Sequence, residues 1–328
     1  MHHPANMSQW HGRTDTADGE LGRRWHQIIK PVNDTADAGI ALLGFASDAG
    51  VARNHGRTGA REGPKELRAM LGNMPVHRCQ TLFDAGDVVC VPDGHGDGLE
   101  TAQQELSAEL ATLLRQGLTP ITLGGGHEMA FGSFGGLAQF LAQQQPATVP
   151  RIGIVNLDAH FDLRMAEQAS SGTPFRQIAE DCARRGWDFN YCCLGVSNFA
   201  NTEALFERAR SLGVRWRLDE EMDCTQLPAT LTALADFIDG VDHVYFTICL
   251  DVLPAAMAPG VSAPSARGVA LEVVEPIVEL VARSGKLRLA DIAELNPAHD
   301  IDHRTARVAA RLVARVAEAV SETARAAA

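Results

Sequence analysis

The sequence predicts an α/β protein built on a parallel sheet. Along the 328 residues, short apolar runs rich in β-branched side chains alternate with longer segments of helical periodicity. Neither an internal repeat nor a Pro/Ser-rich linker interrupts this alternation, so the pattern describes one unit. We therefore expect a single domain over residues 36–328, preceded by a polar, flexible N-terminal lead-in over residues 1–35.

Eight runs have the length and composition of strands: Ile40–Phe45, Thr81–Val89, Thr119–Gly125, Arg151–Asp158, Asn190–Val196, Gly213–Leu218, His243–Val252 and Leu287–Leu295. Eight segments have helical spacing: Gly63–Leu71, Leu99–Gln116, Glu128–Gln143, Phe175–Arg185, Thr202–Leu212, Gln226–Ile238, Leu271–Ser284 and Asp302–Ala319. In open parallel sheets, ligands bind outside the carboxyl ends of the strands. Functional residues are therefore expected just after each strand.

Composition narrows the kinds of partner. The net charge of -12, with no run of Lys or Arg, argues against a general nucleic-acid binder. The sequence contains no run of about 18 apolar residues, so we expect no membrane span. Seven cysteines, with Cys192 and Cys193 adjacent, do not form a disulfide framework, so a reducing cytoplasm is expected. We expect a small-molecule substrate. The amphipathic C-terminal segment suits packing on the sheet and equally suits a homo-oligomer interface.

The segment NLDAHFDLR carries the first chemical signal. Asp158, His160 and Asp162 stand at every second position directly after an apolar run, so in an extended chain all three project to the same side. Two carboxylates and an imidazole crowded together without a counter-ion are costly once desolvated. A bound cation removes that cost, and the triad therefore predicts a metal site.

Three other strand ends carry matching residues. His127 follows a glycine turn in GGGHE, Cys249 and Asp251 are two positions apart in TICLDV, and Glu294 ends DIAEL. Singly, a His after such a turn or an Asp after a strand is more often a helix-start residue. Together they predict one constellation at one edge of the sheet. Mixed carboxylate and imidazole ligands suit Mn, Fe, Co or Zn, and the excess of carboxylates favours Mn²⁺.

These segments, with SGTPFRQI, CLDVLPAAMAPGVSAP, ELNPAHDIDHRTARVAARL and GVARNHGRTGAREGPKELR, resemble the arginase/agmatinase ureohydrolase family. The resemblance runs from about Leu42 to Val316 and is strongest to the members that act on N-formimidoyl-L-glutamate. It implies a three-layer α/β/α fold with an eight-stranded parallel sheet and two Mn²⁺ ions per subunit. It also implies hydrolysis of that substrate to L-glutamate and formamide, in histidine degradation, by a hydroxide that bridges the two ions.

The resemblance assigns roles by position. His127 and Asp162 match ligands of the first metal, and His160 and Asp251 match ligands of the second. Asp158 matches the ligand that bridges both. Asp162 would also orient the nucleophile and pass its proton to the leaving nitrogen. Glu294 matches the acidic residue that pairs with the cationic nitrogen group of the substrate.

Two departures from the family pattern affect the site. Cys249 stands where arginases have a bridging aspartate; a thiolate is a softer ligand than Mn²⁺ prefers, which predicts a weaker second metal and redox sensitivity. The alternative is that Cys249 only packs beside an intact site. In SSGTPF, Ser171 stands where related enzymes commonly carry a proton-shuttling histidine. Arg57 and Arg176 are the candidates for binding the substrate carboxylates.

Two other functions remain open at this point. One is hydrolysis of agmatine or another guanidino compound with release of urea. The other is a metal-poor, non-catalytic binding subunit, which the cysteine at position 249 suggests.

Overall fold

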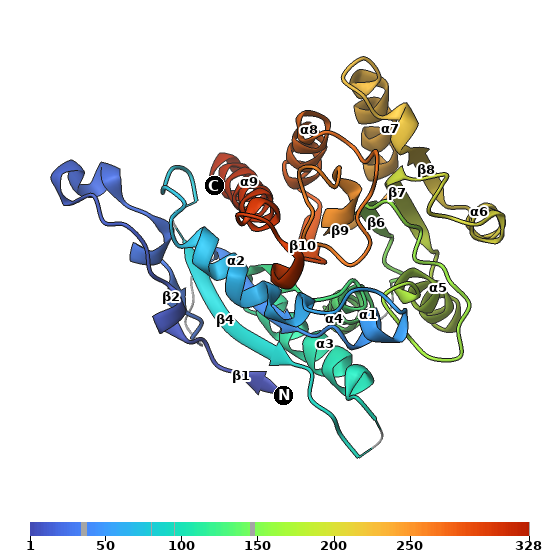
Figure 1. Ribbon diagram of the computed structural model, residues 1–328, viewed down its shortest axis with the longest axis horizontal. Coiled ribbons are helices and arrows are strands. Elements are labelled where there is room, and N and C mark those ends of the chain that lie inside the picture. The colour runs from blue at the N-terminus through green and yellow to red at the C-terminus, as the bar shows by residue number, and fades with distance from the viewer. Residues whose placement is uncertain (34–37, 80, 95, 145–147, 328) are drawn as a thin grey trace.

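A computed structural model describes residues 1–33, 38–79, 81–94, 96–144 and 148–327. Ten strands form one sheet in the order β1-β4-β3-β5-β10-β9-β6-β7-β8, with β2 beside β4 (Figure 1). Their bounds are β1 His2–His3, β2 Lys30–Pro31, β3 Ile40–Ala46, β4 Leu82–Val89, β5 Thr119–Gly124, β6 Ile152–Leu157, β7 Asn190–Val196, β8 Arg215–Leu218, β9 His243–Cys249 and β10 Leu287–Ala293.

The eight predicted strands are β3 to β10, and all the pairings among these eight are parallel. The predicted parallel sheet is therefore confirmed. The two additional strands have two residues each, too few to show any periodicity in the sequence. One of them, β1, is antiparallel to β4.

Nine α-helices lie in the described part of the chain: α1 Ala49–Arg53, α2 Gly63–Leu71, α3 Leu99–Arg115, α4 Met129–Gln144, α5 Pro174–Arg185, α6 Glu203–Ser211, α7 Leu227–Asp239, α8 Leu271–Ala282 and α9 Arg304–Ala327. The eight predicted helices are α2 to α9. The short α1 was not predicted, because five residues contain little more than one helical turn. The last helix continues eight residues beyond the predicted end, since the alanine-rich terminus keeps favouring helix.

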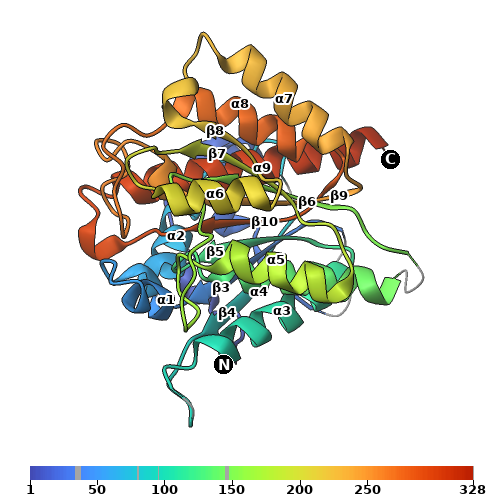
Figure 2. The ribbon, with the colours of Figure 1, turned by 90° about the vertical axis from the view of Figure 1, so that its right-hand side faces the viewer.

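The helices cover both faces of the sheet, which confirms the three-layer architecture (Figure 2). Helices α3, α4 and α5 pack side by side on one face, and α2, α9, α8 and α7 on the other. Apolar residues of the strands pack against each layer, so the strands are buried on both sides. This two-sided burial explains why they appear in the sequence as nearly continuous apolar runs. Within the described residues, no helix has the length and apolar character that a membrane span needs.

The polar N-terminal segment, expected as a flexible lead-in, is attached to the sheet. Trp10 and Trp25 are buried, and Trp10 Nε1 donates a hydrogen bond to Asp84 Oδ2 at 2.6 Å. Asp84 in turn pairs with the buried Arg68 at 2.9 Å. The two tryptophans and the short β1 therefore hold the first residues against the β4 side of the molecule.

Strand order brings together ends that are far apart in the sequence. Strands β5, β10, β9 and β6 are consecutive in the sheet and parallel, although their residues come from positions 119 to 293. Their carboxyl ends therefore deliver GGGHE, the segment after Ala293, CLD and NLDAHFD to one edge of the sheet. The predicted site residues lie at this edge.

Candidate metal centre

A cavity of about 260 Å³ opens at this edge of the sheet. Six of the residues predicted from the sequence line it: His127, His160, Asp162, Cys249, Asp251 and Glu294. The seventh, Asp158, lies beneath the cavity and is fully buried. The structure therefore brings together every predicted metal ligand.

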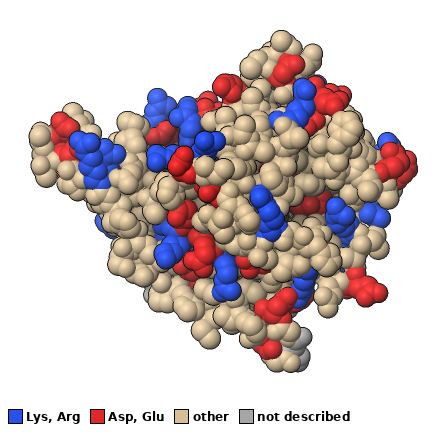
Figure 3. Space-filling model, in the orientation of Figure 1, with Lys and Arg blue, Asp and Glu red and all other residues tan. Residues whose placement is uncertain are grey.

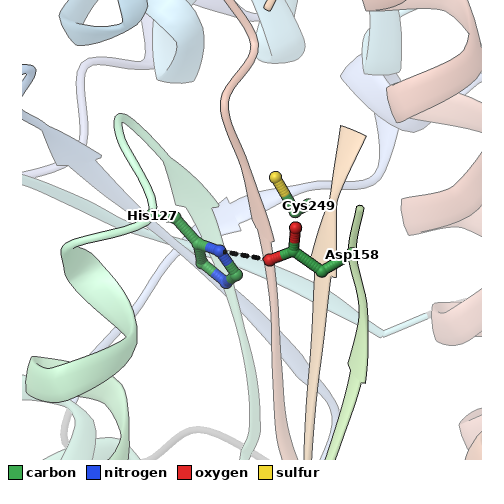
Figure 4. Close-up of side chains that lie close together, drawn as sticks. All are labelled: His127, Asp158 and Cys249. Atoms are coloured by element: carbon green, nitrogen blue, oxygen red, sulfur yellow. Dashed lines mark ion pairs between the residues drawn. The ribbon is translucent and has the colours of Figure 1, made fainter. Parts of the chain in front are cut away.

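Asp158 lies between the two halves of the cluster. Its Oδ2 is 2.9 Å from Nδ1 of His127, and its Oδ1 is 3.5 Å from Nδ1 of His160. Figure 4 shows the carboxylate facing the His127 ring, with the Cys249 side chain beside them. The amide of Asn156 and the backbone N–H of His160 each donate to one oxygen, at 3.1 and 2.7 Å, and hold the carboxylate in this orientation. One side chain thus serves two neighbouring ligand groups.

Each half of the cluster is completed by a second carboxylate. Asp162 Oδ2 is 3.1 Å from Nδ1 of His127, and Asp251 Oδ2 is 3.1 Å from Nδ1 of His160. The side chains form two sets, and within each set the ligand atoms all lie within 4.8 Å of one another. One set is His127, Asp158 and Cys249, and the other is Asp158, His160 and Asp251. The donor arrangement therefore fits two ions that share Asp158.

The ring of His127 is oriented as a metal ligand requires. Its Nε2 lies 2.9 Å from Thr247 Oγ1, while its buried Nδ1 faces the two carboxylates without a well-aligned hydrogen bond. A hydrogen bond from Nε2–H to the Thr247 hydroxyl would leave the Nδ1 lone pair free for a cation. Burial would lower the pKa of His127, but Asp158 and Asp162 raise it well above its usual value. Nδ1 therefore attracts either a proton or a metal ion.

The convergence of Asp158, His160 and Asp162 is confirmed, but its predicted geometry is wrong. Strand β6 ends at Leu157, and the chain bends at residues 159 and 160 instead of continuing as an extended segment. Asp162 adopts a positive φ of 49°, an uncommon conformation for a residue other than glycine. The side chains meet because the loop turns back toward β5 and β9.

Glu294 forms the wall of the cavity beside the two ligand groups. It has a φ of 76°, and its carboxylate accepts hydrogen bonds from the backbone N–H groups of His127 at 2.9 Å and Ser262 at 3.3 Å. Burial, together with the nearby Asp251, raises the pKa of Glu294 to about 7. The backbone conformation and both hydrogen bonds fix an anion at a position where a cationic group can pair with it.

Sequence reasoning missed Glu128, the residue after His127. It is fully buried and accepts hydrogen bonds from Gly50 N and Ser47 Oγ, both at 3.0 Å. Burial and the neighbouring Glu294 raise the pKa of Glu128 to about 8. The sequence does contain a signal for this residue, because a charged glutamate is unusual between a glycine turn and the start of an apolar helix.

These buried carboxyls predict how stability depends on pH once divalent ions have been chelated. The folded pKa values of Glu128 and Glu294 exceed the ordinary value of 4.5, so the folded state binds more protons than the unfolded chain. Their stabilising contribution is complete below about pH 4.5 and is lost as the pH rises through 7 and 8. The raised pKa values of His127 and His160 act in the same direction.

We therefore expect the Tm of the chelated protein to fall by about 5 °C between roughly pH 5.5 and 8.5. Differential scanning calorimetry measures this change, and Glu128→Gln should reduce the slope. Added Mn²⁺ should raise Tm most at the higher pH, because its ligands must be deprotonated. A Tm that stays level or rises with pH in the chelated protein would contradict the expectation.

The predicted substrate-binding arginines do not line the cavity. Arg57 donates to the carbonyls of Pro259 and Val261 at 3.0 and 2.5 Å. Arg176 pairs with Glu180 and donates through Nε to the carbonyl of Arg164 at 2.9 Å. Both guanidinium groups are thus engaged in holding loops.

Ser171 and Arg164 are among the other residues that do line it. Ser171, which the resemblance placed where related enzymes carry a histidine, stands on the wall of the cavity. Arg164, the last residue of the NLDAHFDLR segment, was not among the predicted site residues.

Comparison with known proteins agrees with this geometry. The Arginase family model matches residues 38–318. The formimidoylglutamase of Ralstonia nicotianae is 62% identical over 323 residues, which cover 98% of each protein. That of Aromatoleum aromaticum is 52% identical over 316 residues, 95% of this chain and 92% of the relative.

Solved structures show the same fold. The formiminoglutamase of Trypanosoma cruzi with two Mn²⁺ ions superposes with a TM-score of 0.73 at 25% identity, covering 87% of this chain and 94% of that one. The formimidoylglutamase of Bacillus subtilis gives a TM-score of 0.78 at 21% identity, covering 90% and 91%. Given a family model that matches most of the chain and a relative of such high identity along nearly its whole length, the chain belongs to the arginase family.

Proposed function

We propose that this protein is a manganese-dependent hydrolase that converts N-formimidoyl-L-glutamate and water to L-glutamate and formamide. The observation that carries the proposal is the division of Asp158 between two ligand groups, with one oxygen facing His127 and the other His160. The relatives described above are named for this activity, and the T. cruzi structure contains two Mn²⁺ ions. The complete donor set also argues against a metal-poor binding subunit.

His127, Asp162 and Asp158 would hold one ion, and His160, Asp251 and Asp158 the other. When bound, two such ions acidify a shared water molecule and so supply a nucleophile near neutral pH. Asp162 accepts a proton from that nucleophile and returns it to the leaving nitrogen of glutamate as the C–N bond breaks. Glu294 orients the cationic formimidoyl group through its fixed carboxylate.

The experiment is a coupled assay on protein that has been stripped of metal and then reloaded. Glutamate and formamide should appear in equal amounts from formimidoylglutamate with Mn²⁺ and should be absent after chelation. Agmatine and arginine are tested in parallel for urea. Urea release at a comparable kcat/KM, or no glutamate release from the Mn²⁺-loaded protein, would contradict the proposal.

The free cysteines and the surface charge indicate the cellular compartment of the protein and the kind of partner that it binds. All seven cysteines are free thiols, and we propose that the protein works in the reducing cytoplasm. On the face shown in Figure 3, acidic and basic side chains are interspersed, with no basic patch that would suit nucleic acid. The proposed partner is the small-molecule substrate.

Cys249→Asp tests whether the thiol weakens metal binding. The Cys249 Sγ lies within ligand distance of His127 and Asp158, and a carboxylate there is a harder ligand for Mn²⁺. We expect the variant to bind Mn²⁺ about tenfold more tightly at the ligand group of His127 and Asp158, and to lose less activity after mild peroxide treatment. Metal titration and residual activity measure both. The Cys192→Ser variant is the control, and equal Mn²⁺ affinity in wild type and Cys249→Asp would show that the thiol only packs beside the site.

A further inference from the structure

Two nitrogen donors from different loops meet at the rim of the metal cavity. Arg164, in the loop after β6, and Asn54, just after α1, both line this cavity. They meet over Gly172. A Cβ at Gly172 would lie 2.8 Å from Arg164 Cδ, 3.2 Å from Arg164 Nε and 3.2 Å from Asn54 Nδ2. The absence of a side chain at position 172 is what allows both donors to approach this point.

The backbone beneath these donors is held in place, while the donors themselves are available. Arg164 donates its N–H to the carbonyl of Gly172 at 2.9 Å, and its own carbonyl accepts from Arg176 Nε at 2.9 Å. Asn54 N donates to Gly50 O at 3.0 Å. Both side chains are exposed, and neither has an acceptor within hydrogen-bonding distance in the part of the chain that the structure describes. The arrangement resembles a binding site whose acceptor is supplied from outside.

The substrate requires such a group. Asp158, Asp162 and Asp251 are engaged with the metal ions of the proposed function, and Glu294 is itself an anion, so the two carboxylates of formimidoylglutamate need a cationic partner elsewhere in the cavity. Of the described residues that line the cavity, Arg164 is the single arginine or lysine. A planar guanidinium binds a carboxylate with two parallel hydrogen bonds, and a neighbouring amide N–H can add a third.

We propose that Arg164 and Asn54 form a carboxylate clamp that determines substrate specificity. The clamp binds one of the two carboxylates of the substrate, and Gly172 provides the space for it. This inference rests on the proposed function and extends it: the same guanidinium that attracts the anionic tail of formimidoylglutamate disfavours the cationic tails of agmatine and related amines. Arg176 acts one step away, as a positioning residue that holds the carbonyl of Arg164.

The test combines variants with truncated substrates. N-formimidoyl-4-aminobutyrate lacks the α-carboxylate, and N-formimidoyl-L-glutamine replaces the γ-carboxylate with a neutral amide. Wild-type kcat/KM should fall roughly 10- to 100-fold on the analogue that lacks the clamped carboxylate. The kcat/KM of Arg164→Gln on formimidoylglutamate should fall by a similar factor, mainly because KM rises. On the analogue that lacks the clamped carboxylate, the kcat/KM of this variant should differ little from that of wild type, because the contact is already absent.

Gly172→Ala provides an independent variant. Its backbone conformation accepts alanine, and the new methyl group meets the flexible Arg164 side chain, so the fold should persist while the guanidinium is displaced. It should reproduce the Arg164→Gln losses with unchanged Mn²⁺ content. Arg210→Ala, which removes an exposed charge on α6, is the control and should behave like wild type.

The outcomes separate the two claims. The clamp is overturned if Arg164→Gln has a wild-type KM. It is also overturned if the substitution lowers kcat/KM by the same factor on both analogues as on formimidoylglutamate. Wild-type protein that releases no glutamate from formimidoylglutamate overturns the proposed function, and the clamp with it. Non-additive losses with either analogue support the clamp and identify which carboxylate it binds.

Discussion

Asp158→Asn is expected to reduce kcat/KM on formimidoylglutamate at least a thousandfold, or about 4 kcal/mol of transition-state stabilisation. The reason is geometric. The Asp158 carboxylate is the side chain that reaches both His127 and His160, at 2.9 and 3.5 Å. An amide keeps the size of the group but presents one neutral oxygen instead of a charged pair, so it cannot serve both ligand groups.

Metal content distinguishes this result from unfolding. Mn²⁺ bound to the purified variant, measured by atomic emission, should fall from about two ions per chain to one or fewer. The control is Asp236→Asn, an exposed position on α7, which should keep both the activity and the metal. Two tightly bound ions in Asp158→Asn would show that this carboxylate does not bridge them.

Glu294→Gln should lower kcat/KM about a hundredfold while Mn²⁺ content stays as in wild type. The two backbone N–H groups of His127 and Ser262 donate to different oxygens of Glu294, so the glutamine keeps the size of the side chain and can accept one of the two hydrogen bonds. The variant loses the negative charge beside the cationic formimidoyl group. A charge-assisted contact of this kind contributes about 3 kcal/mol to binding in the transition state.

The same substitution should raise stability. The pKa of Glu294 is raised to about 7 mainly by burial, so its ionised form is unfavourable in the chelated protein above that pH. We expect a higher Tm for the chelated Glu294→Gln variant at about pH 8, together with the lower activity. Glu272→Gln, an exposed position on α8, is the control. Loss of both stability and metal would instead indicate a structural role for Glu294.

Much of the fold was predictable because local residue patterns carry it. Parallel strands buried on both faces require continuous apolar runs, and the covering helices require apolar residues at helical spacing. The short β1 and β2 and the small α1 were not predictable, since so few residues carry no period. The attachment of the N-terminal segment depends on Trp10 and Asp84, which are 74 positions apart.

The sequence by itself determined which residues meet at the candidate metal centre. Strand ends and short motifs single out His127, Asp158, His160 and Asp251, because parallel strands must present their carboxyl ends together. Only the tertiary structure decided how these groups are used. The orientation of the Asp158 oxygens and the partner of His127 Nε2 depend on loops that are distant in the chain. So does the position of Arg164 on the cavity wall, with Arg57 and Arg176 outside it. An arginine in a sequence shows its charge, but whether that charge is free for a substrate or already bound to a carbonyl depends on the neighbours that folding provides.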